Sequence, residues 1–242
     1  MRELHHSKFL VPYSIFIYFV LIMTNFIPIF PLGIVVYPGE DLNLHIFEPR
    51  YIQLINECYA AKKPFGIPAV LNNKMQEYGS IAEVTEIVNG YEIGEMPARL
   101  GHSGGDIRTS GDKVFRILEI IKEVPEKLYS GAIVSYPDNN EKGAPEMMRK
   151  LMASIRELHL LLKVDKDFKK EDADMKCYDV AHHIGLSLEE EYELLNLLDE
   201  RHRQEYMKQH LTKVIPMLAG MEQLKEKVKS NGHFKNLGGF DL

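Results

Sequence analysis

The period of the hydrophobic pattern changes once along the chain, close to residue 140, and this change constrains the fold more than any other feature. Before it, short runs of β-branched and aromatic residues alternate with turn signals such as Pro38–Gly39 and Asn89–Gly90, which is typical of β-strands. These runs cover residues 27–37, 65–71, 81–88, 91–93, 114–121 and 132–136. Many short strands of this kind predict a barrel-like or curled sheet.

One helix is expected within this strand-rich half. Pro49 suits the first turn of a helix, where its missing N–H removes no hydrogen bond. Apolar residues then recur at helical spacing as far as Lys62–Pro64, which would end the helix. The recurring residues are Tyr51, Ile52, Ile55, Cys58 and Tyr59.

From Pro145 onward the apolar residues recur in steps of three and four, which predicts helices packed as a bundle. One stripe consists of Met148, Leu151, Met152, Ile155 and Leu162. A second stripe consists of Met207, Leu211, Val214, Leu218, Met221 and Val228. Pro216 lies within the second stripe and predicts a kink in that helix.

Two polar signals mark helix starts between these stripes. Ser187 and Glu190 fit a capping box, in which each side chain accepts from an otherwise free N–H. Asp172 or Asp174 is placed to cap a shorter helix that ends near Gly185. The predicted fold is therefore α+β, with a β-rich half followed by a helical bundle.

Four segments are predicted along the chain. They are an apolar N-terminal extension at residues 1–25, a β-rich subdomain at 26–137, a helical bundle at 145–230 and a C-terminal tail at 231–242. The polar stretch Asp138–Glu146 links the two halves.

The apolar run Phe9–Met23 is shorter than the roughly 20 apolar residues that span a bilayer, and no small-residue cleavage site follows it. Met23 stands where a natural start would be, so an over-extended start is favoured over a membrane anchor. On this interpretation the protein is cytoplasmic, and it is membrane-anchored only if residues 1–22 are present in the cell.

Charge and cysteine content argue against several classes of function. The net charge is −6, whereas nonspecific phosphate binding is favoured by a basic surface, so a nucleic-acid partner is not favoured, although the net charge leaves room for a local basic patch. The two cysteines, Cys58 and Cys177, form no C-x-x-C motif, which argues against a disulfide framework and a zinc site. We expect neither a metal nor a cofactor.

One motif resembles that of a serine hydrolase. Gly101–Gly105 reads GHSGG and matches G-x-S-x-G, but a nucleophile elbow requires a buried strand before the serine and a helix after it. Strand-like sequence is expected on both sides, so the segment around Ser103 is interpreted as a loop. His182 and His183 are adjacent and would point in different directions on a helix, which is poor metal geometry.

The string LNLHIFEPRY allows two interpretations. His45 and Glu48 could form an acid/base pair. Alternatively, Glu48 could face the free N–H groups of a helix start, and Arg50 could pair with a carboxylate or with backbone carbonyls. Phe47 and Tyr51 would then pack between sheet and helix. We favour this structural interpretation because it accounts for every residue of the string.

The segment PIFPLGIVVYPGEDLNLHIFEPRYIQLI, Pro28 to Ile55, closely resembles the opening of the Lon protease N-terminal domain, in particular that of stand-alone bacterial members. The strings FGIPAVL, YGSIAEVTEIV, DIRTSGDKVFRILEI and LLNLLDERHRQEYMKQHL are similar to later parts of that family. The resemblance covers about Phe26 to Val228. It implies a PUA-like pseudobarrel subdomain followed by an α-helical bundle.

The resemblance also implies a function. In Lon proteases this domain recognises unfolded or tagged proteins, so we expect a non-catalytic protein-binding module or an adaptor for a separate protease or chaperone. The chain contains neither a Walker A loop nor a match to the family's serine–lysine site, so we do not expect an enzyme.

For the binding site we expect Phe47, Arg50 and Tyr51 to contact polypeptide substrate in a groove between the two halves, and His45, Glu48 and Pro49 to form a structural motif. Two alternatives remain open. One is RNA binding, by analogy with other PUA-like folds. The other is a hydrolase that uses Ser103 or the pair His45 and Glu48.

Overall fold

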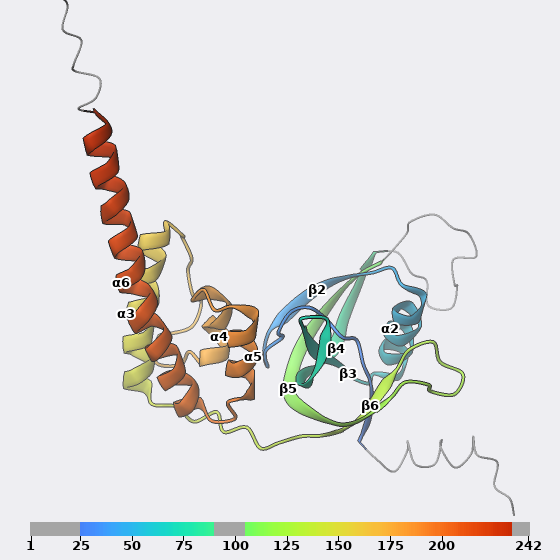
Figure 1. Cartoon of the computed structure of the whole chain (residues 1–242). Helices are drawn as coiled ribbons and strands as arrows, with labels where there is room; N and C mark the ends of the chain where they lie inside the picture. The colour runs from blue at the N-terminus through green and yellow to red at the C-terminus, as the bar shows by residue number, and fades with distance from the viewer. Residues whose placement is uncertain (1–24, 90–104, 234–242) are drawn as a thin grey trace, which may run out of the picture. The chain divides into compact units, whose positions relative to one another are not determined.

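The computed structural model describes residues 25–89 and 105–233, and the chain divides between Pro137 and Asp138 into two compact units (Figure 1). The predicted α+β class is confirmed, because an antiparallel sheet in the first unit precedes the helices of the second. Ser103, the predicted strand at 91–93 and almost all of the predicted N-terminal extension lie outside the described residues.

Within residues 25–89 and 105–137, six strands form the sheet of the first unit. They are β1 (Phe26–Pro28), β2 (Asp41–Ile46), β3 (Phe65–Leu71), β4 (Lys74–Asn89), β5 (Gly105–Ile121) and β6 (Gly131–Ser135). Neighbouring strands follow the order β1-β6-β5-β4-β3, and β2 pairs with β5 beside this path. All of these pairings are antiparallel.

The two ends of this sheet are joined. Bridges from Ile29 to Gly66 and from Leu32 to Ala69 connect the segment after β1 to β3, so the sheet curls onto itself. The predicted strand at 27–37 is therefore wrong in its length, since β1 ends at Pro28 and isolated bridges continue the pairing. The tight turn between β3 and β4 uses Asn72 and Asn73, both with positive φ, the conformation that two-residue hairpin turns favour.

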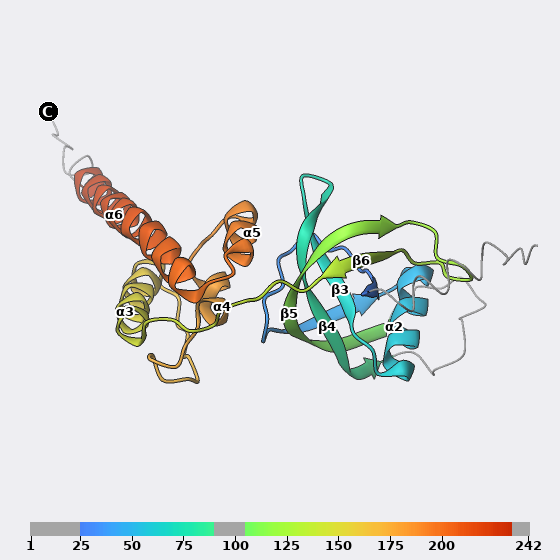
Figure 2. The same cartoon turned by 90° about the horizontal axis from the view of Figure 1, so that it is seen from below.

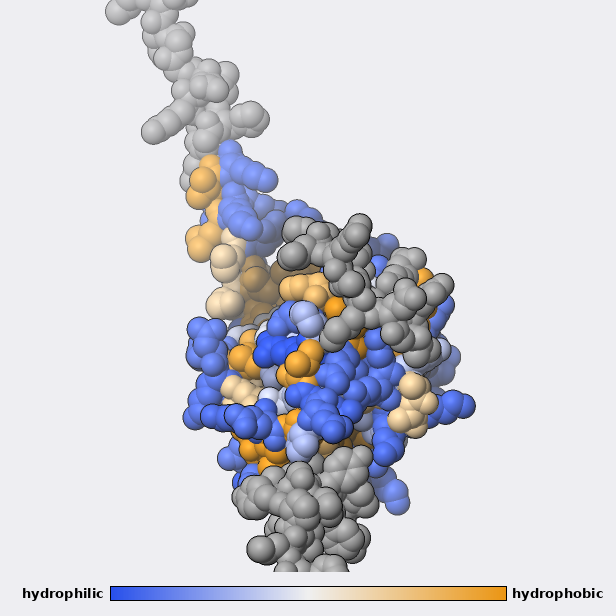
Figure 3. All heavy atoms as spheres, turned by 90° about the vertical axis from the view of Figure 1, so that its right-hand side faces the viewer, coloured by the Kyte–Doolittle hydropathy of each residue, from blue (hydrophilic) through white to orange (hydrophobic). Residues whose placement is uncertain are grey.

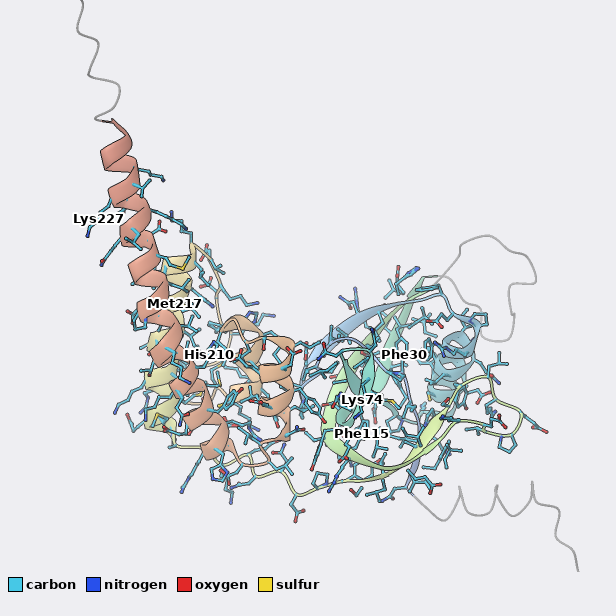
Figure 4. The ribbon with its side chains drawn as sticks, in the orientation of Figure 1. Phe30, Lys74, Phe115, His210, Met217 and Lys227 are labelled. Atoms are coloured by element: carbon cyan, nitrogen blue, oxygen red, sulfur yellow. The ribbon has the colours of Figure 1, made fainter. Side chains whose placement is uncertain are left out.

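Helix α2 (Pro49–Ala61) packs its apolar face against one end of the curled sheet (Figures 1 and 2). Pro49 lies in its first turn, as predicted, and Lys62 ends it in a left-handed conformation. One core cluster joins α2 to the sheet and contains Phe30, Ile52, Leu54, Ile55, Cys58, Phe65 and Ile67 among others. A second cluster surrounds Phe115 (Figure 4).

The second unit is helical. It contains α3 (Pro145–Leu162), α4 (Cys177–Val180), the 3₁₀ helix η1 (Ala181–His183), α5 (Leu188–Asn196) and α6 (Glu200–His233). The predicted capping box is confirmed, since the Ser187 hydroxyl accepts from Glu190 N–H and the Glu190 carboxylate accepts from Ser187 N–H. The predicted cap at Asp172 or Asp174 is wrong, because Lys176 precedes α4 and Asp172 pairs with Arg156 instead.

A buried polar cluster lies at the start of α6. The Arg203 guanidinium, fully buried, donates to Glu200, to the Tyr178 hydroxyl and to the side chain of Asn139. Glu200 in turn accepts from the backbone N–H of Cys177. We call these residues the Arg203 cluster. It attaches the first residues of the second unit, around Asn139, to α4 and α6.

The predicted second stripe is only half buried. Met207 and Leu211 are buried, but Met221 and Val228 are exposed, so the prediction of bundle packing along the whole stripe is wrong. The reason is the length of α3, which ends at Leu162, where Lys163 faces Glu222 of α6 at 3.5 Å. Helix α6 continues through Pro216 and beyond this point without interruption.

In the part of the chain that the structure describes, none of the helices combines the length and the apolar character required to cross a membrane.

Candidate functional site

The corner between β2 and α2, residues 45–51, holds the residues that the sequence analysis singled out. The side chains of β2 alternate, so Asp41, Asn43 and His45 face outward while Ile46 is buried. In the antiparallel register His45 lies opposite Asp106 of β5. The His45 Nδ1 is 2.7 Å from the Asp106 Oδ1, so these two side chains form a pair at the surface.

Glu48 occupies the position before the first turn of α2, but its side chain makes no hydrogen bond to the helix N-terminus. It accepts from Arg50 instead, at 2.9 Å from Nε and 2.7 Å from Nη2. The expectation that Glu48 caps the helix is therefore wrong. Of the two partners expected for Arg50, the carboxylate is the one observed.

Arg50 and Tyr51 connect this surface pair to the core. The Arg50 guanidinium lies over the Tyr51 ring, 4.4 Å from its centroid, and the Tyr51 ring packs against Phe30 at 4.2 Å between centroids. Burial raises the pKa of the Tyr51 hydroxyl, an effect that Arg50 opposes and Glu48 reinforces. Tyr51 thus packs between sheet and helix as predicted.

Phe47 does not pack in this way. Its side chain is 66% exposed and contacts the His45 ring, with centroids 6.2 Å apart and planes inclined by 28°. The prediction that it fills the space between sheet and helix is wrong because Ile46, one position earlier, takes the buried position. We call His45, Phe47, Glu48 and Arg50 the corner patch.

The corner patch is better suited to binding than to acid/base chemistry. His45 pairs with Asp106 and Glu48 pairs with Arg50, so the structure does not bring His45 and Glu48 together as a catalytic pair. An exposed aromatic ring beside an arginine is a combination that recurs in protein-binding surfaces. The roles of Phe47, Arg50 and Tyr51 in binding, and of His45, Glu48 and Pro49 as a structural motif, stay predictions.

The thiols offer no reactive nucleophile. Cys58 and Cys177 are both buried and free. Burial raises the pKa of Cys58 to about 12, and burial together with the nearby Glu200 raises the pKa of Cys177. Thiolates are the nucleophilic form, so neither residue is activated. Within residues 25–89 and 105–233, no cluster of three or more His, Cys, Asp or Glu side chains is arranged to hold a metal ion.

The sequence did not predict the cavities of the described residues, and two of these lie between elements that are far apart in the chain. The first, of about 420 Å³, lies between the end of α2 and β4 and is lined by residues that include Tyr59, Lys62 and Glu83. The second, of about 470 Å³, lies between α3 and α6 and includes Ser154, Lys208 and Ile215. No local sequence pattern predicts either cavity, because each depends on two elements that are distant in sequence.

Comparison with known proteins identifies related domains. A profile of the family described as the ATP-dependent protease La (LON) substrate-binding domain matches residues 27–213. No ATPase or peptidase domain was detected. No curated protein matches the chain.

Solved structures that share the fold include two Lon domains. One is the crystal structure of a Lon N-terminal domain protein from Xanthomonas campestris, with 23% identity, a TM-score of 0.53, and coverage of 74% of this chain and 95% of that one. The other is the N-terminal domain of Mycobacterium avium complex Lon protease, with 13% identity, a TM-score of 0.54, and coverage of 78% and 98%. At these identities the likeness concerns the fold alone.

Proposed function

The chain belongs to the family of the ATP-dependent protease La (LON) substrate-binding domain, and from this premise we propose that it binds segments of unfolded or tagged polypeptides. The family's name supplies the class of ligand.

The exposure of Phe47 carries the proposal for the site. A phenylalanine that is 66% exposed leaves a large apolar surface in water. Its position is fixed, because the backbone on either side belongs to β2 and α2 and the neighbouring Tyr51 packs on Phe30. A ring on such a backbone can contact apolar side chains of an unfolded segment with little loss of backbone entropy in this chain.

The charges around Phe47 add a polar component. The Arg50 side chain is 52% exposed and forms an ion pair with Glu48 at the surface. Such an exposed ion pair contributes little free energy, so another carboxylate can readily replace Glu48 in it. A carboxylate of a bound polypeptide could replace Glu48 as the partner of Arg50, with bidentate geometry. The corner patch therefore favours apolar segments with a nearby acidic group or a chain end.

We extend the proposal to an adaptor role, in which the chain delivers bound segments to a separate ATP-dependent protease or chaperone. A crosslinked pull-down from lysate of the source cells, with tagged protein and mass spectrometry, tests this extension. Enrichment of such a protease or chaperone together with many unrelated polypeptides would support it. A single defined partner, or RNA, in their place would contradict it.

Binding itself is tested with a fluorescently labelled unfolded model protein, reduced and alkylated so that it cannot refold. Its anisotropy is titrated with the full chain, with Phe47→Ala and with the control Leu128→Ala, which removes another exposed apolar side chain of the same unit. We expect Phe47→Ala to weaken binding about tenfold, and Leu128→Ala to change it less than twofold. Equal affinities for the two variants would exclude the corner patch as the site.

A further inference from the structure

Four apolar side chains form a continuous exposed row on the last part of α6. Met217, Met221, Leu224 and Val228 are 58%, 50%, 62% and 71% exposed. We call this row the α6 seam. Figure 3 shows apolar side chains along one side of the end of α6 and hydrophilic side chains along the other. Figure 4 labels Met217, the first residue of the seam.

The seam is not required for the packing of the helical unit. The buried positions of α6 end at Leu211, and α3 ends opposite Glu222, where Lys163 faces it. The match to the substrate-binding family also ends at residue 213, before the seam begins. A row of exposed apolar side chains that neither the bundle nor the family domain accounts for indicates an interaction surface.

The spacing of the seam specifies the shape of its occupant. Its residues are separated by four, three and four positions, which is the a/d pattern of a two-stranded coiled coil. The twelve residues from Met217 to Val228 span about 16 Å of helix, enough for a little more than one and a half heptads. The geometry therefore fits a second helix that lies along α6.

The charges beside the seam specify the chemistry of that helix. With about 100° of rotation per residue, Lys225 and Lys227 lie roughly 70° and 90° to either side of the seam, at the flanking positions. Glu222 and Glu226 lie on the opposite face by the same geometry. Lys225 does contact Glu222, but only at 3.5 Å in an exposed pair, which is a weak interaction.

These flanking lysines disfavour a second copy of the chain as the occupant. In a parallel coiled coil a flanking residue faces the position five residues away on the other helix, so in a pair of copies Lys225 and Lys227 would face Gly220 and Gly232 and would gain no acidic partner. Acidic residues at the same positions would form interhelical ion pairs instead. We infer that the α6 seam is the docking site for an amphipathic helix of another protein whose apolar stripe is flanked by glutamate or aspartate.

The test uses two synthetic helical peptides of three heptads with leucine at every a and d position. One carries glutamate at the flanking positions and the other carries lysine. Binding to the full chain is measured by fluorescence anisotropy at low salt. We expect the acidic peptide to bind at least tenfold more tightly than the basic one, and added salt to weaken its binding.

Two variants of the full chain locate the site. Leu224→Glu is expected to lower the affinity for the acidic peptide at least tenfold. Leu118→Glu, at an equally exposed leucine of β5, is expected to leave that affinity unchanged. The double variant Lys225→Glu and Lys227→Glu keeps the apolar seam and is expected to prefer the basic peptide. Circular dichroism confirms that each variant keeps its helical content.

Three results would overturn the inference. The first is equal affinity for the acidic and the basic peptide. The second is a dimer in analytical ultracentrifugation that Leu224→Glu dissociates, which would make a second copy the occupant. The third is binding to anionic vesicles that Leu224→Glu abolishes, together with no binding of either peptide, which would make the seam a lipid-binding face.

Discussion

The Arg203 guanidinium donates to the Glu200 carboxylate at 2.7 Å, with both side chains almost completely closed to solvent, at 0% and 2% exposure. The two residues lie one turn apart at the start of α6. Further hydrogen bonds from Arg203 reach Asn139 and Tyr178, and its guanidinium lies 4.2 Å from the Tyr178 ring centroid. The pair is therefore the centre of a satisfied polar network rather than an isolated ion pair.

Removal of the guanidinium should destabilise the helical unit strongly. Arg203→Met leaves the Glu200 carboxylate buried without its cation, which typically costs about 3–5 kcal/mol. Urea unfolding followed by far-ultraviolet circular dichroism measures the loss. The control is Arg201→Met, two positions away and exposed, for which we expect less than about 0.5 kcal/mol. A loss below about 1 kcal/mol for Arg203→Met would contradict this account of the cluster.

Gly79 of β4 should not tolerate a side chain. A Cβ at this position would lie 2.2 Å from the Ile67 carbonyl oxygen and 2.6 Å from the Pro68 Cα, both backbone atoms of the paired strand β3. We expect Gly79→Ala to destabilise the β-rich unit by about 2–3 kcal/mol in denaturant unfolding. Gly33→Ala is the matched control, because its Cβ would meet no atom within 4 Å. Similar stabilities for the two variants would refute the close approach of β3 and β4.

Glu57 of α2 should make stability depend on pH. Burial pushes the pKa of its carboxyl group upward, but hydrogen bonds from Lys127 and Tyr129 outweigh burial and hold that pKa below the ordinary value of 4.5. Because the pKa is lowered in the folded state, the stabilising contribution is present above pH 4.5 and is lost as the pH falls through the folded-state pKa.

The variant Glu57→Gln measures this contribution. We expect its deficit in unfolding free energy to be constant from about pH 7 to pH 5.5 and to shrink toward zero at the lowest accessible pH. Glu119→Gln, at an exposed position of β5, should show no such trend. A deficit for Glu57→Gln that grows as the pH falls would contradict the prediction.

The two thiols should be protected in the folded protein. Cys58 and Cys177 are buried and their pKa values are raised, so thiolate is scarce at pH 8 and little of either side chain is exposed to reagents. We expect alkylation at least about a hundredfold slower in the native state than in urea, with mass spectrometry assigning each site. A native rate equal to that of a free thiol standard would show that one of the two sites is open.

Local patterns predicted the parts of the fold that depend on local interactions. The capping box of Ser187 and Glu190 spans four residues, and Pro49 occupies the first turn of α2. The position of Tyr51 against the sheet also follows from helical spacing, since it shares a face with Ile55 and Cys58.

Contacts between distant residues could not be predicted in this way. The partner of His45 is Asp106, on a strand that lies sixty-one residues further along the chain. The exposure of Phe47 depends on which side of β2 faces the core, and neither aromatic character nor local spacing decides that. The second stripe of α6 shows the same limit, because its spacing identifies an apolar face while the end of α3 decides where that face is covered.

The pairing of β1 with β6 has a consequence for the growing polypeptide on the ribosome. Phe26 lies opposite Ile133 and Pro28 opposite Gly131, so the first and last strands of the β-rich unit are neighbours. Contacts of such large sequence separation form slowly, because a long loop must close before they are gained. Until β6 has emerged from the ribosome, the nascent chain cannot close its sheet. During this time it presents open strand edges to chaperones.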